Sequence, residues 1–463
     1  MVVVEPEWCL VGEELRRDVA LTLDGGVVAA IGPATGHGTL LPGRLALPGL
    51  VNAHSHAFQR AFRGHVQWRE TGRDDFWSWR DRMYAVANGL TPDGIEAVSA
   101  LAFLEMALAG ITRVGEFHYL HHQPDGAPYA DPDELAHRVL AAAAEVGLGI
   151  TLLRVAYLRS TAGAPLRPDQ RRFGDRDADA VLAAVDRLTA ATSRADGVRI
   201  GLAPHSVRAV DRDSLRRLAS FGGIVHAHVS EQPAENATCL AENGASPLAV
   251  LDDAGVVTQR FSAVHLTFPL EGDLERLVRA GASVCVCPST ELDLGDGFLP
   301  VAVREAARMC IGSDSHAVID PLGEARTLEL HARALAGRRN VLAPETPAGS
   351  DRSGLGLPLD RSGLGLPLDR SGLARRILAA ATTEGDRALG GAGLGIAVGA
   401  PADLCVLDLR RVAADGVPPL EAAAFVAGPE WVESVWVGGR PIVDRGHHPR
   451  ADAIRARARP FLG

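Results

Sequence analysis

The sequence of 463 residues contains no lysine, so all 47 of its basic side chains are arginine. It has no stretch that approaches the roughly 18 uninterrupted apolar residues of a membrane-spanning helix. The first residues, MVVVEPEWCLVGEEL, lack the basic region and the small-residue cleavage site of a signal peptide. We therefore expect a cytoplasmic protein that does not interact with membranes.

Cysteine is also scarce. The six cysteines are scattered along the chain without the paired spacing of a zinc finger, and we expect them to be buried thiols. The net charge of −10 disfavours nucleic acid as a partner. A local pocket lined by arginine is still compatible with an acidic small molecule.

Length and composition indicate a globular protein with a large core. Hydrophobic residues make up 47 % of the chain and charged residues 22 %, as in folded soluble domains. The chain is longer than an ordinary domain of roughly 100 to 200 residues, although (β/α)8 barrels reach about 250 or more. One large domain beside a smaller one is therefore expected.

Eight short apolar runs alternate with helical stretches between about residue 45 and residue 316. The runs are LALPGLVNAHSHA, ITRVGEFHYL, GITLLRVAYL, VRIGLAPHS, GIVHAHVSE, FSAVHLTF, ASVCVCPST and RMCIGSDSH. Connections long enough for crossover helices predict eight parallel strands. We favour a TIM-type (β/α)8 barrel over an open doubly wound sheet, because the count is eight and no glycine-rich phosphate loop follows the first run.

Capping residues mark two of the helices between these runs. Thr91 is predicted as the N-cap of one helix, with Gly110 beyond its end. Asp131 and Gly147 are predicted to bound the next helix in the same way.

Both ends of the chain carry alternating β segments. The first end includes DVALTLDGGVVAAIG, with Asp24-Gly25 as a hairpin turn, and the other end includes GAPADLCVLDL and WVESVWVGGRPIVDRG. Since neither end can bury a β layer alone, we expect them to pair into one small, discontinuous β-sandwich. The predicted sandwich comprises residues 1–47 and 389–463, and the predicted barrel domain comprises residues 48–388.

A tandem repeat occupies residues 351–373, where DRSGLGLPL occurs twice and is followed by DRSGL. We expect a duplicated surface loop or helix extension, since solenoids need longer repeating units. We assign this segment no chemistry.

Candidate metal ligands occur where the predicted strands end. His54 and His56 lie two apart at the end of the first run, so their side chains project to the same side. The fifth run supplies His228, the sixth His265, and the eighth is followed by Asp314. The carboxyl ends of barrel strands carry active sites, and imidazole nitrogens with one carboxylate suit zinc. These residues therefore predict a catalytic metal site with a position left for water.

Other histidines receive simpler interpretations. His226 lies on the same strand face as His228 but one pleat deeper, so we expect it to be an interior histidine. His118, His121 and His122 straddle the end of the second run, and we favour loop structure over a second metal site there.

The ordered motifs resemble those of the amidohydrolase superfamily. They are PGLVNAHSH in the first run, HVSE in the fifth, VH in the sixth, GSDSH in the eighth, and the late segment VGAPADLCVLD. Together they span nearly the whole chain. The resemblance implies a metal-dependent hydrolase with one divalent ion, expected to be zinc, on His54, His56, His228 and Asp314.

Within this superfamily the chain resembles the formimidoylglutamate deiminases. The resemblance rests on SHAFQRAFRG, FWSWRDRMY, EFHYLHH, APHSVRAV, HVSEQ and CPSTELDLGDG. It implies hydrolysis of a linear amidine, N-formimino-L-glutamate, to N-formyl-L-glutamate and ammonia in L-histidine degradation. It assigns proton transfer to Glu231, His265 and Asp314. The implied substrate-binding residues are Gln59, Arg80, Tyr119, His205 and Arg208.

The missing lysine bears on the number of metal ions. Some members of the superfamily hold two ions bridged by a carboxylated lysine of the fourth strand. This chain has no lysine, and its fourth run ends in APHS. We therefore expect a mononuclear site and deamination at a C=N carbon.

The implied roles agree with the chemistry of the residues. A zinc ion lowers the pKa of bound water to roughly 7. Asp314 and His265 are suited to accept the water's proton, and Glu231 to protonate the leaving nitrogen. Arg80 and Arg208 suit the two carboxylates of the substrate, since a guanidinium binds a carboxylate through two hydrogen bonds.

Tyr119 fits this assignment less simply. Strand alternation places Glu116 and His118 on one face and Tyr119 on the other, so Tyr119 reaches the pocket only if the strand has ended by then.

Two alternative functions are kept open. The first is the same chemistry on guanine or another amino-heterocycle, which the two arginines disfavour because a neutral ring has no carboxylate. The second is an inactive barrel that acts as a scaffold, which the complete ligand set disfavours. A homodimer is the expectation for a soluble enzyme of this kind.

Overall fold

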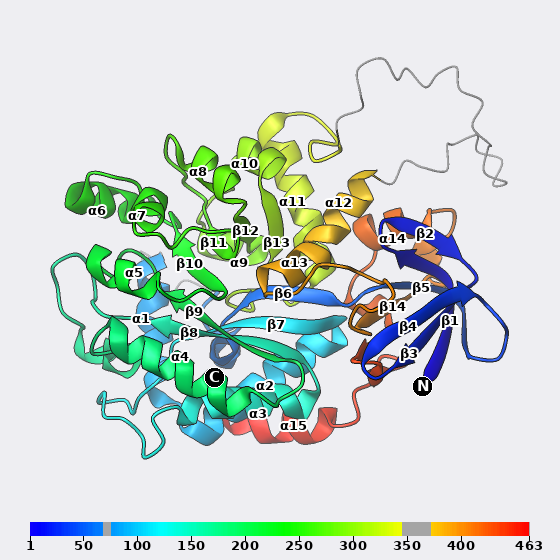
Figure 1. Ribbon diagram of the computed structural model, residues 1–463, viewed down its shortest axis with the longest axis horizontal. Helices are drawn as coiled ribbons and strands as arrows, with labels where there is room; N and C mark the ends of the chain where they lie inside the picture. The colour runs from blue at the N-terminus through cyan, green and yellow to red at the C-terminus, as the bar shows by residue number, and fades with distance from the viewer. Residues whose placement is uncertain (68–75, 345–371, 463) are drawn as a thin grey trace.

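The computed structural model describes residues 1–67, 76–344 and 372–462 (Figure 1). It contains a barrel of parallel strands surrounded by helices and a second, mixed sheet. The tandem repeat lies outside the described residues, except for its last two, which begin α12 (Gly372–Ala380). Within these ranges no helix has the length and apolar character that crossing a bilayer requires.

Eight parallel strands form the barrel in chain order, each hydrogen-bonded to the next. They are β6 (Leu50–Ser55), β7 (Ile111–His118), β8 (Gly149–Ala156), β9 (Val198–Pro204), β10 (Val225–Val229), β11 (Phe261–His265), β12 (Ser283–Val286) and β13 (Arg308–Ile311). Each predicted run contains one of them, so the predicted barrel is confirmed. A parallel bridge between Ser55 and Asp314 joins the first strand to the segment after the last.

Helices cover the outside of this barrel (Figure 1). They are α2 (Pro92–Leu108), α3 (Glu134–Val146), α4 (Ala178–Thr192), α5 (Arg212–Leu218), α6 (Pro233–Asn243), α7 (Pro247–Asp253), α8 (Asp273–Ala280), α9 (Pro288–Leu294), α10 (Val301–Ala306), α11 (Pro321–Ala336), α12 and α13 (Thr383–Ala388). Side chains of α1 (Phe76–Gly89) and of the 3-10 segment η1 (Ala57–Phe62) line a cavity at the carboxyl ends of the strands. A further 3-10 segment, η2 (Pro168–Phe173), follows β8.

The ends of two helices test the capping predictions. Thr91 caps α2 as expected, since its side chain accepts a hydrogen bond from the N–H of Gly94 at 3.1 Å. The predicted start of α3 is wrong, because the helix begins two residues later with Asp133 as the N-cap. Asp131 instead accepts a hydrogen bond from the N–H of Asp133 at 3.0 Å, which forms a turn before the helix.

Both chain ends contribute to the second sheet, as predicted. Its strands are β1 (Val2–Val11), β2 (Glu14–Arg17), β3 (Val19–Asp24), β4 (Val27–Pro33), β5 (Thr39–Pro48), β14 (Leu404–Asp408), β15 (Val432–Val437) and β16 (Arg440–Asp444). They are hydrogen-bonded in the order β16-β15-β14-β5-β1-β3-β4, with β2 on β1. Antiparallel pairing of β5 with β14 joins the two ends. The hairpin between β3 and β4 turns at Gly25 and Gly26, whose φ angles of 56° and 83° suit glycine.

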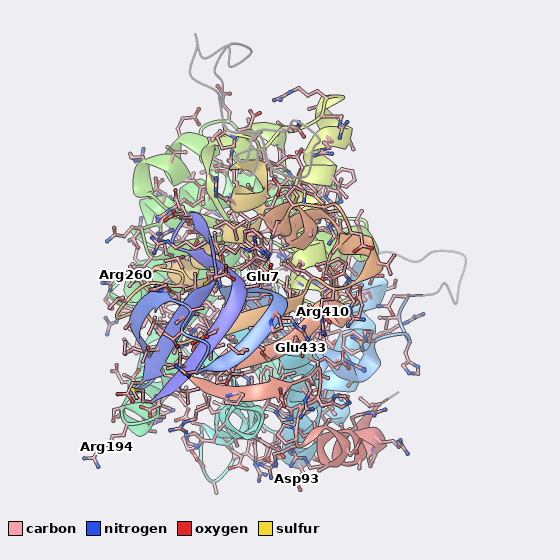
Figure 2. The ribbon with its side chains drawn as sticks, turned by 90° about the vertical axis from the view of Figure 1, so that its right-hand side faces the viewer. Glu7, Asp93, Arg194, Arg260, Arg410 and Glu433 are labelled. Atoms are coloured by element: carbon pink, nitrogen blue, oxygen red, sulfur yellow. The ribbon has the colours of Figure 1, made fainter. Side chains whose placement is uncertain are left out.

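Ion pairs reinforce the junction between the two chain ends. The guanidinium of Arg44 in β5 lies 3.1 Å from Glu433 of β15 and 3.7 Å from Asp408 of β14. The side chain of Arg44 is only 8 % exposed, so solvent screens these contacts weakly. Figure 2 views the molecule from the side of this sheet, with Glu7, Arg410 and Glu433 labelled.

The last part of the chain also packs on the barrel. Helix α14 (Pro419–Phe425) contacts α11 and α12, and α15 (Ala451–Ala458) contacts α2. Buried residues of α14 and α15 belong to the same apolar core as the barrel strands. Residues 389–463 therefore complete the terminal sheet and also extend the outer layer of the barrel.

Candidate metal centre and active site

The predicted ligands lie at the carboxyl ends of their strands. His54 is in β6 and is followed two residues later by His56, while His228 is in β10. His265 ends β11, and Asp314 lies three residues beyond β13. His265 and Asp314 have left-handed φ angles of 69° and 45°, a backbone conformation that side chains disfavour and that recurs at functional sites.

The four predicted ligands converge on one point. The Nε2 atoms of His54 and His56 lie 3.4 Å and 3.2 Å from Oδ1 of Asp314. Nε2 of His228 lies 3.2 Å from Nε2 of His54. Within the described ranges, the groups that could hold a metal are two triads that share His54. They are His54, His56 and His228, and His54, His265 and Asp314.

Hydrogen bonds on the far side of two rings fix which nitrogen faces the centre. Nδ1 of His56 donates to the carbonyl of Phe117 at 3.1 Å, and Nδ1 of His228 donates to the carbonyl of His205 at 3.1 Å. Their Nε2 lone pairs therefore point inward together with the Asp314 carboxylate. Lone pairs that face one another repel, and a divalent cation between them removes this repulsion. The donor set thus fits a bound zinc-type ion.

Burial and charge hold these groups in the protonation states that a metal requires. Burial lowers the pKa of His54 to about 3 and that of His228 well below its ordinary value. Burial alone would raise the pKa of Asp314, but the neighbouring imidazoles of His54 and His56 hold it well below its ordinary value. The site accordingly combines neutral imidazoles with an ionised carboxylate.

His265 lies between three carboxylates. Its Nε2 is 3.7 Å from Oε1 of Glu231 and 3.7 Å from Oδ2 of Asp314, while its Nδ1 is 3.4 Å from Oε1 of Glu291. Burial would lower the pKa of His265, but Glu231, Glu291 and Asp314 raise it to about 10. The geometry brings the three residues predicted to transfer protons within reach of one another.

The predicted substrate-binding residues line one cavity beside the ligands. Its walls include His56, His228, Glu231 and Asp314. The predicted substrate-binding residues in its walls are Gln59, Arg80, Tyr119, His205 and Arg208. Strand β7 ends at His118, so Tyr119 leaves the strand alternation and faces the cavity. Its hydroxyl accepts a hydrogen bond from Nε2 of Gln59 at 3.0 Å.

Several residues of the site were not predicted. Glu291 contacts His265 from α9, which follows β12, and the sequence signal that marks it is an acidic residue just after a barrel strand. Tyr157 lines the cavity directly after β8, the position that Tyr119 has after β7. Tyr84 lines it from α1, where no sequence pattern marks it.

Glu116 of β7 anchors the chain on both sides of His56. It accepts hydrogen bonds from the hydroxyl of Ser55 at 2.6 Å and from the N–H of Ala57 at 2.8 Å. Burial raises the pKa of Glu116 to about 7. Glu116 therefore positions a predicted ligand without facing the metal centre.

Gly312 lets the segment that carries Asp314 pass close to β6. A Cβ atom at Gly312 would lie 2.7 Å from Cβ of His54 and 2.8 Å from its carbonyl oxygen, so the backbone must shift. We expect Gly312→Ala to lower the free energy of unfolding by about 1–3 kcal/mol. Urea denaturation measures this change. The matched control is Gly222→Ala, where a Cβ meets nothing within 4 Å, and equal midpoints for the two variants would contradict the argument.

The remaining histidines lie outside the metal centre. Nε2 of His226 is 2.9 Å from the carbonyl oxygen of Ala388, on the deeper pleat expected for it. Nε2 of His121 lies 3.0 Å from the carbonyl oxygen of Val155 and 2.5 Å from the guanidinium of Arg154. A neighbouring guanidinium disfavours a second cation, and in the described part of the chain the candidate metal groups do not include His121.

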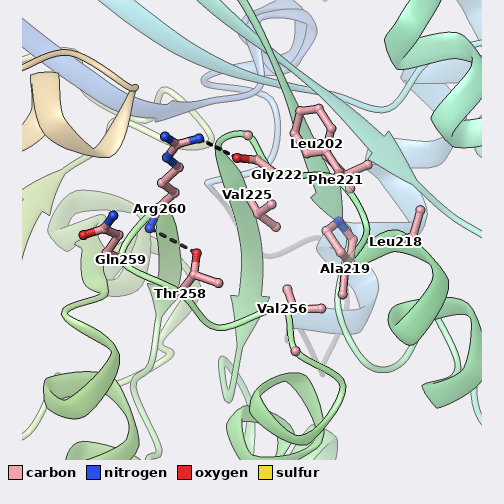
Figure 3. A pocket seen from close by; sticks show the side chains of 13 residues that line it. Leu202, Leu218, Ala219, Phe221, Gly222, Val225, Val256, Thr258, Gln259 and Arg260 are labelled. Carbon is pink, nitrogen blue, oxygen red and sulfur yellow. Dashed lines mark hydrogen bonds between the residues drawn. The ribbon is translucent and has the colours of Figure 1, made fainter.

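A larger cavity lies outside the barrel, between α5 and the beginnings of β10 and β11 (Figure 3). Its volume is about 250 Å³, against about 50 Å³ for the cavity beside the metal ligands. Leu202, Leu218, Phe221 and Val256 make its walls apolar, and Arg260 is its one ionisable lining residue. Its lining therefore offers no acid–base pair, and we place the chemistry in the smaller cavity.

A model of the amidohydrolase family matches residues 45–442. The chain belongs to the amidohydrolase family. Formimidoylglutamate deiminase of Pseudomonas aeruginosa is 36 % identical over 459 residues, which cover 97 % of this chain and 96 % of that protein. The 8-oxoguanine deaminase of the same organism is 31 % identical over 277 residues, which cover 58 % of each chain.

The fold is shared with solved amidohydrolases. The crystal structure of an amidohydrolase from Brucella melitensis superposes with a TM-score of 0.89 at 33 % identity, covering 100 % of this chain and 99 % of that chain. Family membership and the deaminase relatives identify this amidohydrolase as a hydrolase that acts on carbon–nitrogen bonds.

Proposed function

We propose that this amidohydrolase hydrolyses N-formimino-L-glutamate to N-formyl-L-glutamate and ammonia, as a step of L-histidine degradation. The observation that carries the proposal is a metal-type cluster that opens into a cavity containing Arg80 and Arg208. Two guanidinium groups suit the two carboxylates of this substrate. The similarity to formimidoylglutamate deiminase over 97 % of the chain supports the same substrate.

The proposed metal is a single zinc ion on His54, His56, His228 and Asp314. Three imidazole nitrogens and one carboxylate are ligands that zinc accepts, and a further position would remain for water. An ion bound there supplies an activated water near neutral pH.

The protein side chains would manage the protons of the reaction. Water oxygen bonds to the imino carbon, the bond from that carbon to the terminal nitrogen breaks, and both water protons leave in ammonia. The charge of a bound ion would lower the pKa of His265, so Asp314 and His265, which lie together, would both be placed to accept the first proton. Glu231 lines the cavity 3.7 Å from His265 and is placed to protonate the leaving nitrogen.

Arg208 connects substrate binding with Glu231. Its Nη2 lies 3.3 Å from Oε2 of Glu231, and its Nε lies 3.9 Å from Oε2 of Glu235. A substrate carboxylate that binds Arg208 competes with these acidic groups. Binding would therefore release Glu231 from its ion pair for proton transfer.

The rival function is deamination of an amino-heterocycle, which the similarity to 8-oxoguanine deaminase favours. Ammonia release from N-formimino-L-glutamate, N-formimino-L-aspartate and guanine decides between the two, with metal content measured on the same preparation. We expect the first compound to be the best substrate. Activity on guanine alone would exclude the proposed substrate, and failure to bind zinc, manganese and iron would exclude the metal mechanism.

Replacement of Arg208 tests the carboxylate contact. We expect Arg208→Ala to raise the KM for N-formimino-L-glutamate by about 10- to 100-fold, because a charge-assisted hydrogen bond is lost. We expect metal content to stay at the wild-type level, because Arg208 is not one of the proposed ligands. Steady-state kinetics and metal analysis provide the measurements.

The control for this variant is Arg212→Ala, which removes an arginine that pairs with Asp253 outside the cavity. It should leave KM and metal content unchanged. Metal loss in Arg208→Ala would instead place Arg208 in support of the metal centre.

A further inference from the structure

Two phenols and one amide form a buried triangle in the wall of the active-site cavity. The hydroxyl oxygens of Tyr84 and Tyr157 lie 3.2 Å apart. Nε2 of Gln170, in η2, lies 3.1 Å from each of them. Tyr84 and Tyr157 are 3 % and 5 % exposed and line the cavity, whereas Gln170 lies behind them at 1 % exposure.

The hydrogen bonds within this triangle leave one tyrosine hydroxyl proton without an acceptor. Oε1 of Gln170 accepts the backbone N–H of Arg167 at 3.1 Å, which fixes the orientation of the amide. Each N–H of Gln170 therefore points at one phenol oxygen. One phenol proton bridges the two oxygens, and in the described part of the structure the other proton has no acceptor besides this pair. It is available to a ligand in the cavity.

Ring contacts connect the triangle with the metal ligands. They lead from His228 to His205, with centroids 4.8 Å apart, and then to Tyr157 at 4.9 Å. The guanidinium of Arg80 lies 5.8 Å from the ring centroid of Tyr84. A phenol donor and a guanidinium thus occupy the same part of the cavity.

The proposed substrate has a carboxylate at a matching position. Its imino carbon must reach the metal centre, its α-carboxylate is attached next to the amidine, and its γ-carboxylate is farther away. Arg208 contacts Glu231, the proposed acid, and therefore lies near the reacting carbon. The α-carboxylate is then assigned to Arg208, which leaves Arg80 and the two phenols for the γ-carboxylate.

We propose that Tyr84 and Tyr157 are specificity-determining residues, which donate a hydrogen bond to the γ-carboxylate of the substrate beside Arg80. This inference rests on the function proposed above. The phenols act as one unit, because either can bridge to its neighbour while the other donates to the ligand. Burial raises the pKa of Tyr157 well above its ordinary value, so it stays protonated as a donor at neutral pH.

The sharing of one proton gives an unusual mutational pattern. In Tyr84→Phe or Tyr157→Phe, the remaining phenol still accepts from Gln170 and keeps its own proton for the ligand. Each single variant should therefore change KM little. The double variant loses the donor and should raise the KM for N-formimino-L-glutamate by about tenfold or more, since a hydrogen bond to a charged group is removed.

The experiment compares two substrates of equal side-chain length. N-formimino-L-norvaline carries a methyl group where N-formimino-L-glutamate carries the γ-carboxylate. In the double variant KM should rise for the glutamate compound and stay unchanged for the norvaline compound, with kcat little affected. Tyr129→Phe removes a tyrosine outside the cavity and serves as the control.

A third substitution is added to limit the loss of stability in the double variant. Without the phenols, Gln170 would keep two buried N–H groups unpaired. Gln170→Leu removes both, and it leaves the N–H of Arg167, in a partly exposed segment, without its side-chain acceptor. The triple variant should show the same selective rise in KM. An equal rise in KM for both substrates would reduce the tyrosines to a structural role, and an unchanged KM would exclude the contact.

Failure of the proposed function gives a different result. If the wild type releases ammonia from neither compound, the substrate assignment fails. Calorimetric titration with the glutarate dianion then tests the tyrosines alone. Weaker binding in the double variant supports the inference, whereas equal binding, or no binding to the wild type, overturns it.

Discussion

Glu231→Gln is expected to lower kcat by about 10²- to 10⁴-fold, the usual contribution of a positioned acid–base group. The amide preserves the shape of the side chain but does not deliver a proton to the leaving nitrogen. Glu231 lines the cavity near His265 and is not one of the four proposed ligands, so metal content should stay at the wild-type level. Ammonia release under saturating N-formimino-L-glutamate measures the effect.

A matched control separates this loss from a general charge effect. Glu271→Gln removes an exposed carboxylate outside the cavity and should leave kcat unchanged. If Glu231→Gln keeps most of the wild-type kcat, the acid must be sought elsewhere, and Asp296 is one alternative. Burial and the charge of Glu231 raise the pKa of Asp296 to about 9, so it holds a proton at neutral pH.

His228→Ala is expected to remove the metal and to lower activity by more than about 100-fold. Mutation of residues that only hydrogen-bond to a metal ligand already lowers metal affinity or activity by up to about 100-fold. His228 contributes one of the inward-facing nitrogens, and alanine offers no substitute. Metal analysis of the wild type should give one ion per chain. After chelation, added zinc should restore the wild type and not the variant.

The control lies two residues away on the same strand. His226→Gln alters a buried histidine that contacts the carbonyl of Ala388 rather than the metal centre. This variant should keep its metal. Full metal content in His228→Ala would show that the ion is held by the other triad, which contains His54, His265 and Asp314.

The sequence was most informative about features with a regular period. Eight apolar runs at crossover spacing predicted all eight barrel strands, because parallel strands must be apolar and connected by helices. Alternation within strands placed His54 and His56 on one side. The start of α3 was predicted two residues too early, because Asp131 is as good a cap by residue type as Asp133, and only the local turn distinguishes them.

The less predictable features depend on tertiary packing. Tyr84 reaches the cavity because α1 lies across the carboxyl ends of the strands, and no short-range pattern encodes that position. Asp314 lies beyond β13 in a left-handed conformation, so strand alternation did not define its direction. Glu291 contacts His265 across two elements. These residues become recognisable only once the barrel brings the strand ends together.

The bridge between Ser55 and Asp314 gives the proposed metal a second consequence. The N–H of His56 donates to the carbonyl of Asp314 at 3.1 Å, and the N–H of Asp314 donates to the carbonyl of His54 at 3.0 Å. The proposed ligands thus lie on both sides of the seam where the barrel meets itself. An ion bound there would stabilise the fold, because it binds the native barrel and not the unfolded chain. The melting temperature would then rise with the free metal concentration, which a thermal melting curve measures.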